Sequence, residues 1–221
     1  MSPATLIKIC GIKDSEMLSQ AIRAGADYVG FNHFPKSPRY VDISQIGELI
    51  KSTPKNVKSV VLLVNPDVKT LASIVALKPD FVQFHGNESA AWIKDALANT
   101  DQPAIKVLPI GSKSDLEAIH PFIGLVEHIL LDAKPPKSAT RPGGLGETFD
   151  WSLLKGVDKN LGFFLAGGLN PDNVARAITQ VNPLGVDVAS GVERAPGIKD
   201  SELITKFVVN AKQADKDRDK P

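Results

Sequence analysis

The sequence contains only one cysteine, Cys10, in 221 residues. A single cysteine can form neither an internal disulfide nor a cysteine-based zinc cluster, which fits a reducing compartment. The chain also lacks an excess of either charge: 26 Lys and Arg against 25 Asp and Glu leave a formal net charge of +1. This balance gives no electrostatic attraction to nucleic acid or to an anionic membrane, and we expect neither as a partner.

Long apolar runs are lacking as well. The first ten residues, MSPATLIKIC, do not contain the apolar region of a signal peptide, and no run approaches the roughly 20 residues that cross a bilayer. With 43% hydrophobic residues, the chain can still bury a substantial core. We therefore expect a cytoplasmic protein.

Eight short apolar runs, rich in β-branched residues, alternate with segments of helical periodicity. The pattern repeats about every 20–35 residues, which is the length of a βα unit. Eight units predict an α/β protein with a single (β/α)8 TIM barrel over residues 1–210. The segment 211–221, AKQADKDRDKP, has lost the apolar period, and we expect a disordered tail there. The predicted strands are 5–10, 27–32, 57–64, 80–85, 104–108, 128–132, 161–166 and 185–190.

Helix starts fit the same scheme. Asp14, Asp67, Asn87 and Asn170 stand where N-caps are expected, and Pro171 suits a first helical position. The alternative is an open doubly wound sheet, which normally has fewer strands and a glycine-rich loop after the first one. The first predicted strand is followed by one isolated glycine, which favours the barrel.

Side-chain alternation predicts which polar residues face the barrel interior. In the first strand Ile7 and Ile9 must face the helices, so Lys8 and Cys10 point inward. The same reasoning places His85 inward at the end of its strand. A strand cysteine is often an inert small hydrophobe, but one at a barrel mouth can also act as a nucleophile or base.

Two aspartates lie at later strand ends, where barrel active sites form. Asp132 ends the run HILLD. Burying a carboxylate there costs free energy, so we expect it to be paired with another group or to serve in the reaction. Asp187 lies between two valines and could instead brace a neighbouring loop. For Lys8 and Lys106 we favour structural charges in a network inside the barrel. His85 is more consistent with a hydrogen-bonded polar residue than with a metal ligand.

Glycine-rich loops follow the seventh and eighth predicted strands. LAGGLNPDNV contains Gly167 and Gly168, and ASGVE contains Ser190 and Gly191. Barrels often hold a phosphate between these two loops through backbone N–H groups, which glycine leaves accessible. Both loops occur at the expected positions, so we predict a phosphate site.

Two further loops are candidates for ligand contact. The segment 133–151 is long for a connection between a strand and a helix, and glycines including Gly144 would allow it to close over the mouth of the barrel. Arg39 lies in a loop stiffened by Pro35 and Pro38. It could grip a planar carboxylate through two hydrogen bonds, or it could be a surface charge.

Taken together, KICG, SPRYV, VQFHG, LLDAK…GGLGETFDW, LAGGLNPDNV and GVDVASGVE…GIKD resemble the phosphoribosylanthranilate isomerase family of tryptophan biosynthesis, over about residues 6–208. The resemblance implies a barrel without metal or organic cofactor. It also implies an Amadori rearrangement of N-(5'-phosphoribosyl)anthranilate to the corresponding deoxyribulose phosphate. The substrate would be a phosphorylated small molecule.

The resemblance also implies roles for individual residues. Cys10 corresponds to the general base, Asp132 to the general acid and Arg39 to the partner of the anthranilate carboxylate. The chain departs from the family at His33, Leu145 and Glu147, which affects loop contacts rather than the acid and base. The implied phosphate-binding residues are Gly144, Gly167, Gly168, Ser190 and Gly191, and the possible supporting residues are Lys8, His85 and Asp187.

Three rival functions remain at this point. A decarboxylase barrel would need an aspartate where Lys137 stands. A metal-dependent epimerase would draw its ligands from His33, His85, Asp132 and Asp187. A non-catalytic barrel that senses phosphoribosyl ligands would need only the glycine loops and the loop arginine. The sequence leaves open whether the protein is a monomer or a homodimer, and whether it accepts a second aminoaldose phosphate.

Overall fold

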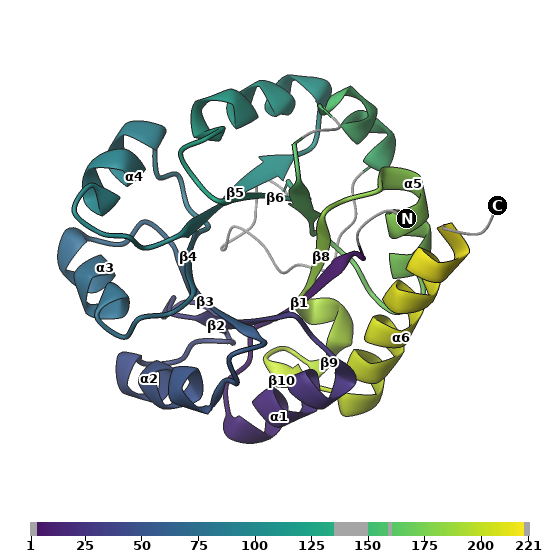
Figure 1. The fold of residues 1–221 in the computed structure, drawn as a ribbon, viewed down its shortest axis with the longest axis horizontal. Coiled ribbons are helices and arrows are strands. Elements are labelled where there is room, and N and C mark those ends of the chain that lie inside the picture. Colours follow the sequence, from purple (N-terminus) through teal and green to yellow (C-terminus); the bar gives the residue numbers. More distant parts are fainter. Residues whose placement is uncertain (1–3, 135–149, 159–160, 219–221) are drawn as a thin grey trace.

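The computed structural model describes residues 4–134, 150–158 and 161–218. Eight parallel strands hydrogen-bond in chain order and close into a barrel, as predicted. The helices lie around the ring of strands (Figure 1). The strands are β1 (Leu6–Cys10), β2 (Tyr28–Asn32), β3 (Lys58–Leu63), β4 (Phe81–Phe84), β5 (Ala104–Ile110), β6 (His128–Ala133), β7 (Phe163–Leu165) and β8 (Gly185–Val188).

The connections are α-helical except at three places after β5, β6 and β8, where 3₁₀ helices occur. Pro121 lies inside the first of them and removes a backbone donor that an α-helix would use. A short hairpin, β9 (Glu193–Ala195) with β10 (Ile198–Lys199), follows the last 3₁₀ turn. The helices are α1 (Ser15–Ala24), α2 (Ile43–Ser52), α3 (Val68–Val75), α4 (Ala90–Leu97), η1 (Lys113–Phe122), η2 (Trp151–Gly156), α5 (Val174–Val181), η3 (Ser190–Val192) and α6 (Ser201–Arg218).

The predicted N-caps are confirmed for two helices and wrong for two. The side chains of Asp14 and Asp67 accept hydrogen bonds from the first turns of α1 and α3. Ser89, rather than Asn87, caps α4. The side chain of Asn170 accepts the backbone N–H of the second residue after it, which forms a turn before α5.

That turn also moves the start of α5. Asn173 is its N-cap and Val174 its first residue, so Pro171 lies outside the helix and not at its first position. The asparagine at residue 170 competes for backbone donors locally, and the helix begins only when that turn is complete.

Burial divides the strand side chains into two sets. Those facing outward pack with the helices into one large cluster, in which Ile7, Ile9 and Leu131 are completely or almost completely buried. Those facing inward form a separate cluster inside the barrel. The members of this interior cluster are Tyr28, Val60, Phe81, Ile105, Val107, Leu130, Phe164 and Ala166, with Leu6 and Leu184 packed against them. Lys8 and Cys10 share the phase of Leu6 and therefore face the interior, as predicted.

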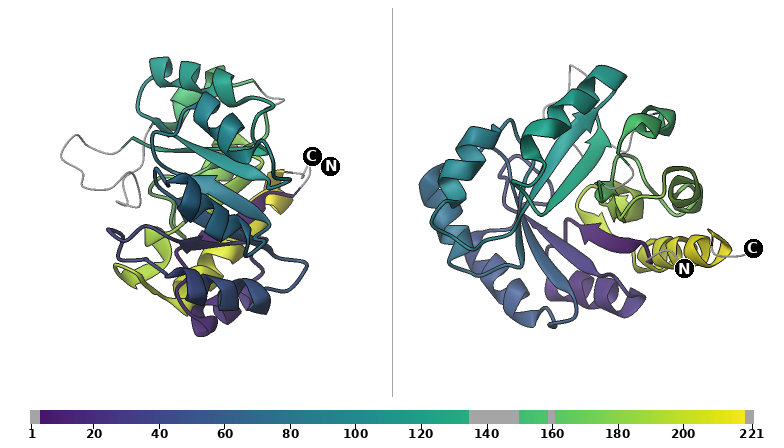
Figure 2. Two further views of the ribbon diagram at one scale, coloured as in Figure 1. Left: turned by 90° about the vertical axis from the view of Figure 1, so that its left-hand side faces the viewer. Right: turned by 45° about the horizontal axis from the view of Figure 1, so that its top comes forward.

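The expected tail differs from the structure. Helix α6 continues to Arg218, so the prediction of disorder from residue 211 is wrong for 211–218. Ala211 and Ala214 are buried on its inner face, and small side chains suffice for close helix packing. Asp215 accepts hydrogen bonds from the backbone N–H and the hydroxyl of Thr5, at 2.8 and 2.6 Å. These bonds attach the end of α6 to the residue before β1, and Figure 2 shows α6 (yellow) next to β1 (purple).

Across the described parts of the chain, the helices are too short or too polar for any of them to span a bilayer.

Candidate active site

Cys10 is the last residue of β1 and points into the barrel mouth. It is 5% exposed, and its neighbour in β2 is Gly30. A Cβ atom at residue 30 would lie 2.8 Å from the Cys10 sulfur, so the glycine provides the space for the thiol. Burial raises the pKa of the Cys10 thiol, and the ammonium groups of Lys8 and Lys199 offset this effect only in part.

Lys8 lies one layer deeper in the barrel and is completely buried. Its Nζ atom lies 2.7 Å from Oδ1 of Asp187, its register partner in β8. Burial lowers the pKa of Lys8, but the charge of Asp187 and the nearby thiol outweigh burial and leave that pKa raised. The expected charge network inside the barrel is thus present for Lys8, with Asp187 as its partner.

Asp132 occupies the corresponding mouth position on β6 and is 7% exposed. Its Oδ1 atom accepts the backbone N–H of Ala133 at 2.8 Å. Its Oδ2 atom lies 3.3 Å from Nε2 of His85, which follows β4. This contact is not a hydrogen bond, and Nε2 of His85 has no hydrogen-bond partner among the described residues. The structure therefore brings these two predicted residues together as a close, loosely oriented pair.

Cys10 and Asp132 open onto the same end of the barrel, because all eight strands run parallel and both residues lie at strand C-termini. In the closed order β1 and β6 are separated by β7 and β8, so the two side chains do not stand on neighbouring strands. A thiol and a carboxyl group on separate strands of one mouth can act on a single bound molecule from different sides.

Gln83 is a polar interior residue to which the sequence assigned no role. It lies in β4 two residues before His85 and is almost completely buried. Neither its amide oxygen nor its amide nitrogen has a hydrogen-bond partner in the described structure. Buried amides are normally paired, so this side chain is available to a bound molecule or water.

The two glycine loops touch each other. Gly167 and Gly168 have φ angles of +88° and +62°, which glycine adopts without steric cost. A Cβ atom at Gly191 would lie 1.8 Å from the carbonyl oxygen of Leu169. The loop that carries Ser190 and Gly191 is therefore packed directly against the one after β7, as the phosphate prediction requires. Gly144, with Leu145 and Glu147, lies outside the described residues.

Arg39 is not a surface charge, since it is only 4% exposed. Its Nε and Nη2 atoms donate to the two carboxylate oxygens of Glu193 at 2.7 and 2.8 Å. The edge of the guanidinium that was expected to grip a ligand carboxylate is thus occupied by the protein itself. Its stem packs over Gly11, where a Cβ atom would lie 2.5 Å from Cδ of Arg39. This places Arg39 beside the residue that follows Cys10.

Glu193 and Lys199 extend the charge pair of Arg39, and the sequence indicated a role for neither of them. Lys199 lies 3.0 Å from Oε1 of Glu193 and donates to the carbonyl of Ala189 at 2.7 Å. Burial raises the pKa of Glu193, but the cations of Arg39 and Lys199 outweigh burial and lower it. Burial lowers the pKa of Lys199 despite the opposing charge of Glu193.

Lys106 was expected inside the barrel, and this prediction is wrong. Its neighbours Ile105 and Val107 belong to the interior cluster, so Lys106 faces the helices. Its Nζ atom bonds to Oε2 of Glu88 at 2.7 Å and to the carbonyl of Gly86 at 2.8 Å. Lys106 therefore stabilises the loop after β4 from the helix-facing side of the barrel.

Of the four side chains of the metal-dependent alternative, only His85 and Asp132 lie close to each other. Nδ1 of His33 lies 3.0 Å from the carbonyl of Val41, and Asp187 is paired with Lys8. Over the residues that the structure describes, no three His, Cys, Asp or Glu side chains are arranged to hold a metal ion.

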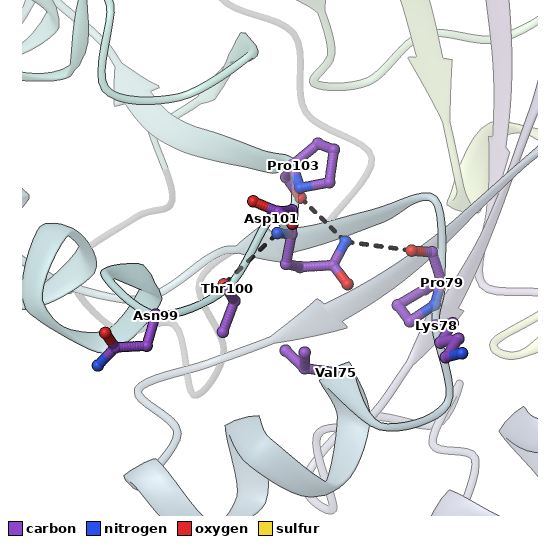
Figure 3. A pocket seen from close by; sticks show the side chains of 8 residues that line it. Val75, Lys78, Pro79, Asn99, Thr100, Asp101 and Pro103 are labelled. Carbon is purple, nitrogen blue, oxygen red and sulfur yellow. Dashed lines mark hydrogen bonds between the residues drawn. The ribbon is translucent and has the colours of Figure 1, made fainter.

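A pocket of about 450 Å³ lies at the opposite end of the barrel, where the strands begin. Figure 3 shows the side chains that line it. It is formed by the segments that lead into β4 and β5, and Gln102 spans it by hydrogen bonds to Pro79 and Pro103. The N-terminal face of a barrel usually serves stability rather than chemistry. None of the predicted site residues lines this pocket.

Comparisons with known proteins agree with these features. The family model described as N-(5'phosphoribosyl)anthranilate (PRA) isomerase matches residues 7–210. The N-(5'-phosphoribosyl)anthranilate isomerase of Bradyrhizobium diazoefficiens is 44% identical over 204 residues, which cover 92% of each chain. The phosphoribosyl anthranilate isomerase structure from Thermotoga maritima has a TM-score of 0.85 at 36% identity, covering 95% of this chain and 99% of its own. A structure of such an isomerase with reduced 1-(o-carboxyphenylamino)-1-deoxyribulose 5-phosphate has a TM-score of 0.82 at 33% identity, with the same coverage.

Proposed function

Because this chain belongs to the N-(5'-phosphoribosyl)anthranilate isomerase family, we propose that it rearranges N-(5'-phosphoribosyl)anthranilate to 1-(o-carboxyphenylamino)-1-deoxyribulose 5-phosphate in tryptophan biosynthesis. The observation that carries this proposal is the position of Cys10 and Asp132 on separate strands of one barrel mouth. The reaction needs an acid at the ring oxygen of the sugar and a base at C2′, and these two groups supply them.

In the proposed mechanism Asp132 donates a proton to the furanose ring oxygen. The bond from C1′ to that oxygen breaks, and a Schiff base forms between C1′ and the anthranilate nitrogen. The thiolate of Cys10 then removes the proton from C2′, which gives an enolamine that tautomerises to the ketone. General acid–base assistance of this kind contributes about 100- to 10,000-fold per group.

The raised pKa of Cys10 makes the cations around it relevant to this mechanism. Burial favours the protonated thiol, whereas Lys8 and Lys199 favour the thiolate. Lys8 stays charged because Asp187 pairs with it. We assign Lys8 and Asp187 to support of the base, and His85 to support of Asp132, from which it lies 3.3 Å away.

The substrate's two anionic groups would be held apart from the reacting carbons. We assign the phosphate to the backbone of Gly167, Gly168, Ser190 and Gly191. We assign the anthranilate carboxylate to Arg39. Its Nη1 group would donate to that carboxylate, because Nη1 donates no hydrogen bond to the described residues. Binding energy from such remote groups orients C2′ toward the base.

We further propose that the enzyme works in the cytoplasm without a metal or organic cofactor, as a monomer or a homodimer. Measuring activity after exhaustive treatment with a chelator tests whether the enzyme works without a metal. Loss of activity that is restored by a divalent cation would contradict it. Sedimentation equilibrium distinguishes the two assembly states.

The direct test generates phosphoribosylanthranilate in situ from anthranilate and phosphoribosyl diphosphate with a coupling transferase, and follows the decay of its fluorescence. We expect rapid turnover by the purified protein. Binding of the reduced product analogue without turnover would instead support the non-catalytic sensor.

A further inference from the structure

A buried charge cluster connects two loops at the barrel mouth. It consists of Arg39 from the β2–α2 connection, Glu193 of β9 and Lys199 of β10, and the hairpin that carries the last two lies beside the barrel (Figure 1). All three side chains are at most 5% exposed. The cluster joins segments that are 154 residues apart in the chain.

The cluster is not electrically neutral. Two cations share one carboxylate, which leaves one excess positive charge out of contact with water. The carboxylate of Asp187 on β8 is not part of the cluster, because it is paired with Lys8. While the Cys10 thiol, which interacts with Lys199, is protonated, the cluster carries an excess positive charge, and this makes it complementary to an anionic ligand group.

The hydrogen bonds also fix the orientation of Arg39. Both oxygens of Glu193 hold the Nε and Nη2 edge of the guanidinium, and Oε2 additionally accepts the backbone N–H of Gly197 at 3.1 Å. Lys199 bonds to the carbonyl of Ala189, the residue before Ser190, at 2.7 Å. One network therefore places the arginine relative to both Gly11 and the loop assigned to the phosphate.

We propose that Glu193 is a positioning residue for recognition of the aromatic carboxylate of the substrate, and that Lys199 orients it in turn. Glu193 does not touch the substrate; it holds the guanidinium so that the remaining N–H groups face the mouth. The cluster's excess charge then selects a substrate that carries a carboxylate at this point. This inference rests on the proposed isomerase function.

The test compares two substrates. One is phosphoribosylanthranilate, and the other is the analogue made from aniline, which lacks the carboxylate. In E193Q we expect KM for the carboxylate substrate to rise on the order of 10- to 100-fold, because a displacement of about 1 Å is sufficient for such losses. Activity with the aniline analogue should change much less, so that the ratio of the two kcat/KM values falls by at least about tenfold. In an R39A background, E193Q should not lower this ratio further.

Two additional variants separate positioning from folding. E193Q/K199M keeps one excess cation in the cluster and remains informative if E193Q alone does not fold; it should also lose discrimination. D80N removes a carboxylate that pairs with Lys58 at the other end of the barrel, 3.0 Å away, and should leave discrimination unchanged. Equal losses on both substrates in E193Q, or the same change in D80N, would overturn the proposal. Absence of turnover by the wild-type protein would refute the isomerase function itself.

Discussion

Gly30 faces Cys10 across the β1–β2 ladder, and a Cβ atom at residue 30 would come within 2.8 Å of the cysteine sulfur. The thiol can occupy its position only because residue 30 has no side chain. Gly30→Ala must displace the sulfur or the strand, so we expect kcat/KM to fall about 10- to 100-fold in a folded protein. Steady-state kinetics with circular dichroism measures both parts of this expectation.

The matched control for this prediction is Gly47→Ala in α2. A Cβ atom there would lie 3.4 Å from Leu77, which is an ordinary contact. Alanine in a helix interior should raise the free energy of unfolding by about 0.5–1 kcal/mol and leave kinetics unchanged. Full activity of Gly30→Ala would show that the thiol position is not critical.

The proposed acid and base can be removed separately. Cys10→Ala and Asp132→Asn should each lower kcat by about 100- to 10,000-fold, because each removes one proton-transfer group. Binding of the reduced product analogue, measured by calorimetry, should persist in both variants, since the anion-binding groups are untouched. Wild-type turnover in either variant would exclude that residue from the mechanism.

The proposed base also predicts a pH dependence. Burial raises the pKa of the Cys10 thiol above its ordinary value, and a base must be deprotonated to act. Below that pKa the thiol is protonated, so kcat/KM should rise with pH on the alkaline side of neutrality. The rate of Cys10 alkylation by iodoacetamide should rise over the same range, because the thiolate is the nucleophile. A kcat/KM that is flat between pH 7 and 9 would contradict the assignment.

The strand order and the inward orientation of Cys10 could be predicted from the sequence, because the apolar residues Ile7 and Ile9 define the outer face of their strand. The same argument fails for Lys106. Its neighbours Ile105 and Val107 are apolar, but so are residues at the helix-facing positions, and only the structure shows which face is which.

The pair of Arg39 and Glu193 could not be predicted by spacing, since the two residues are 154 positions apart. The motif GVE…GIKD includes Glu193 and Lys199, but it does not predict the hairpin that brings the two residues together. The length of α6 was missed for a different reason. Its last turns bury alanines rather than large apolar residues, so the periodic pattern is weak although the packing continues.

The contact between Gly191 and Leu169 tests the phosphate assignment. In Gly191→Ala the added Cβ atom would lie 1.8 Å from a backbone oxygen, which no side-chain movement can relieve, so the two glycine loops must separate. We expect KM to rise about tenfold or more, together with the inhibition constant of inorganic phosphate, because oriented backbone N–H groups bind the anion. Gly124→Ala is the control: its φ of +75° also disfavours alanine, but nothing lies within 4 Å of the added atom. That variant should lose stability without a change in phosphate inhibition. If Gly191→Ala is folded and its phosphate inhibition constant equals that of the wild type, the anion binds elsewhere in the mouth.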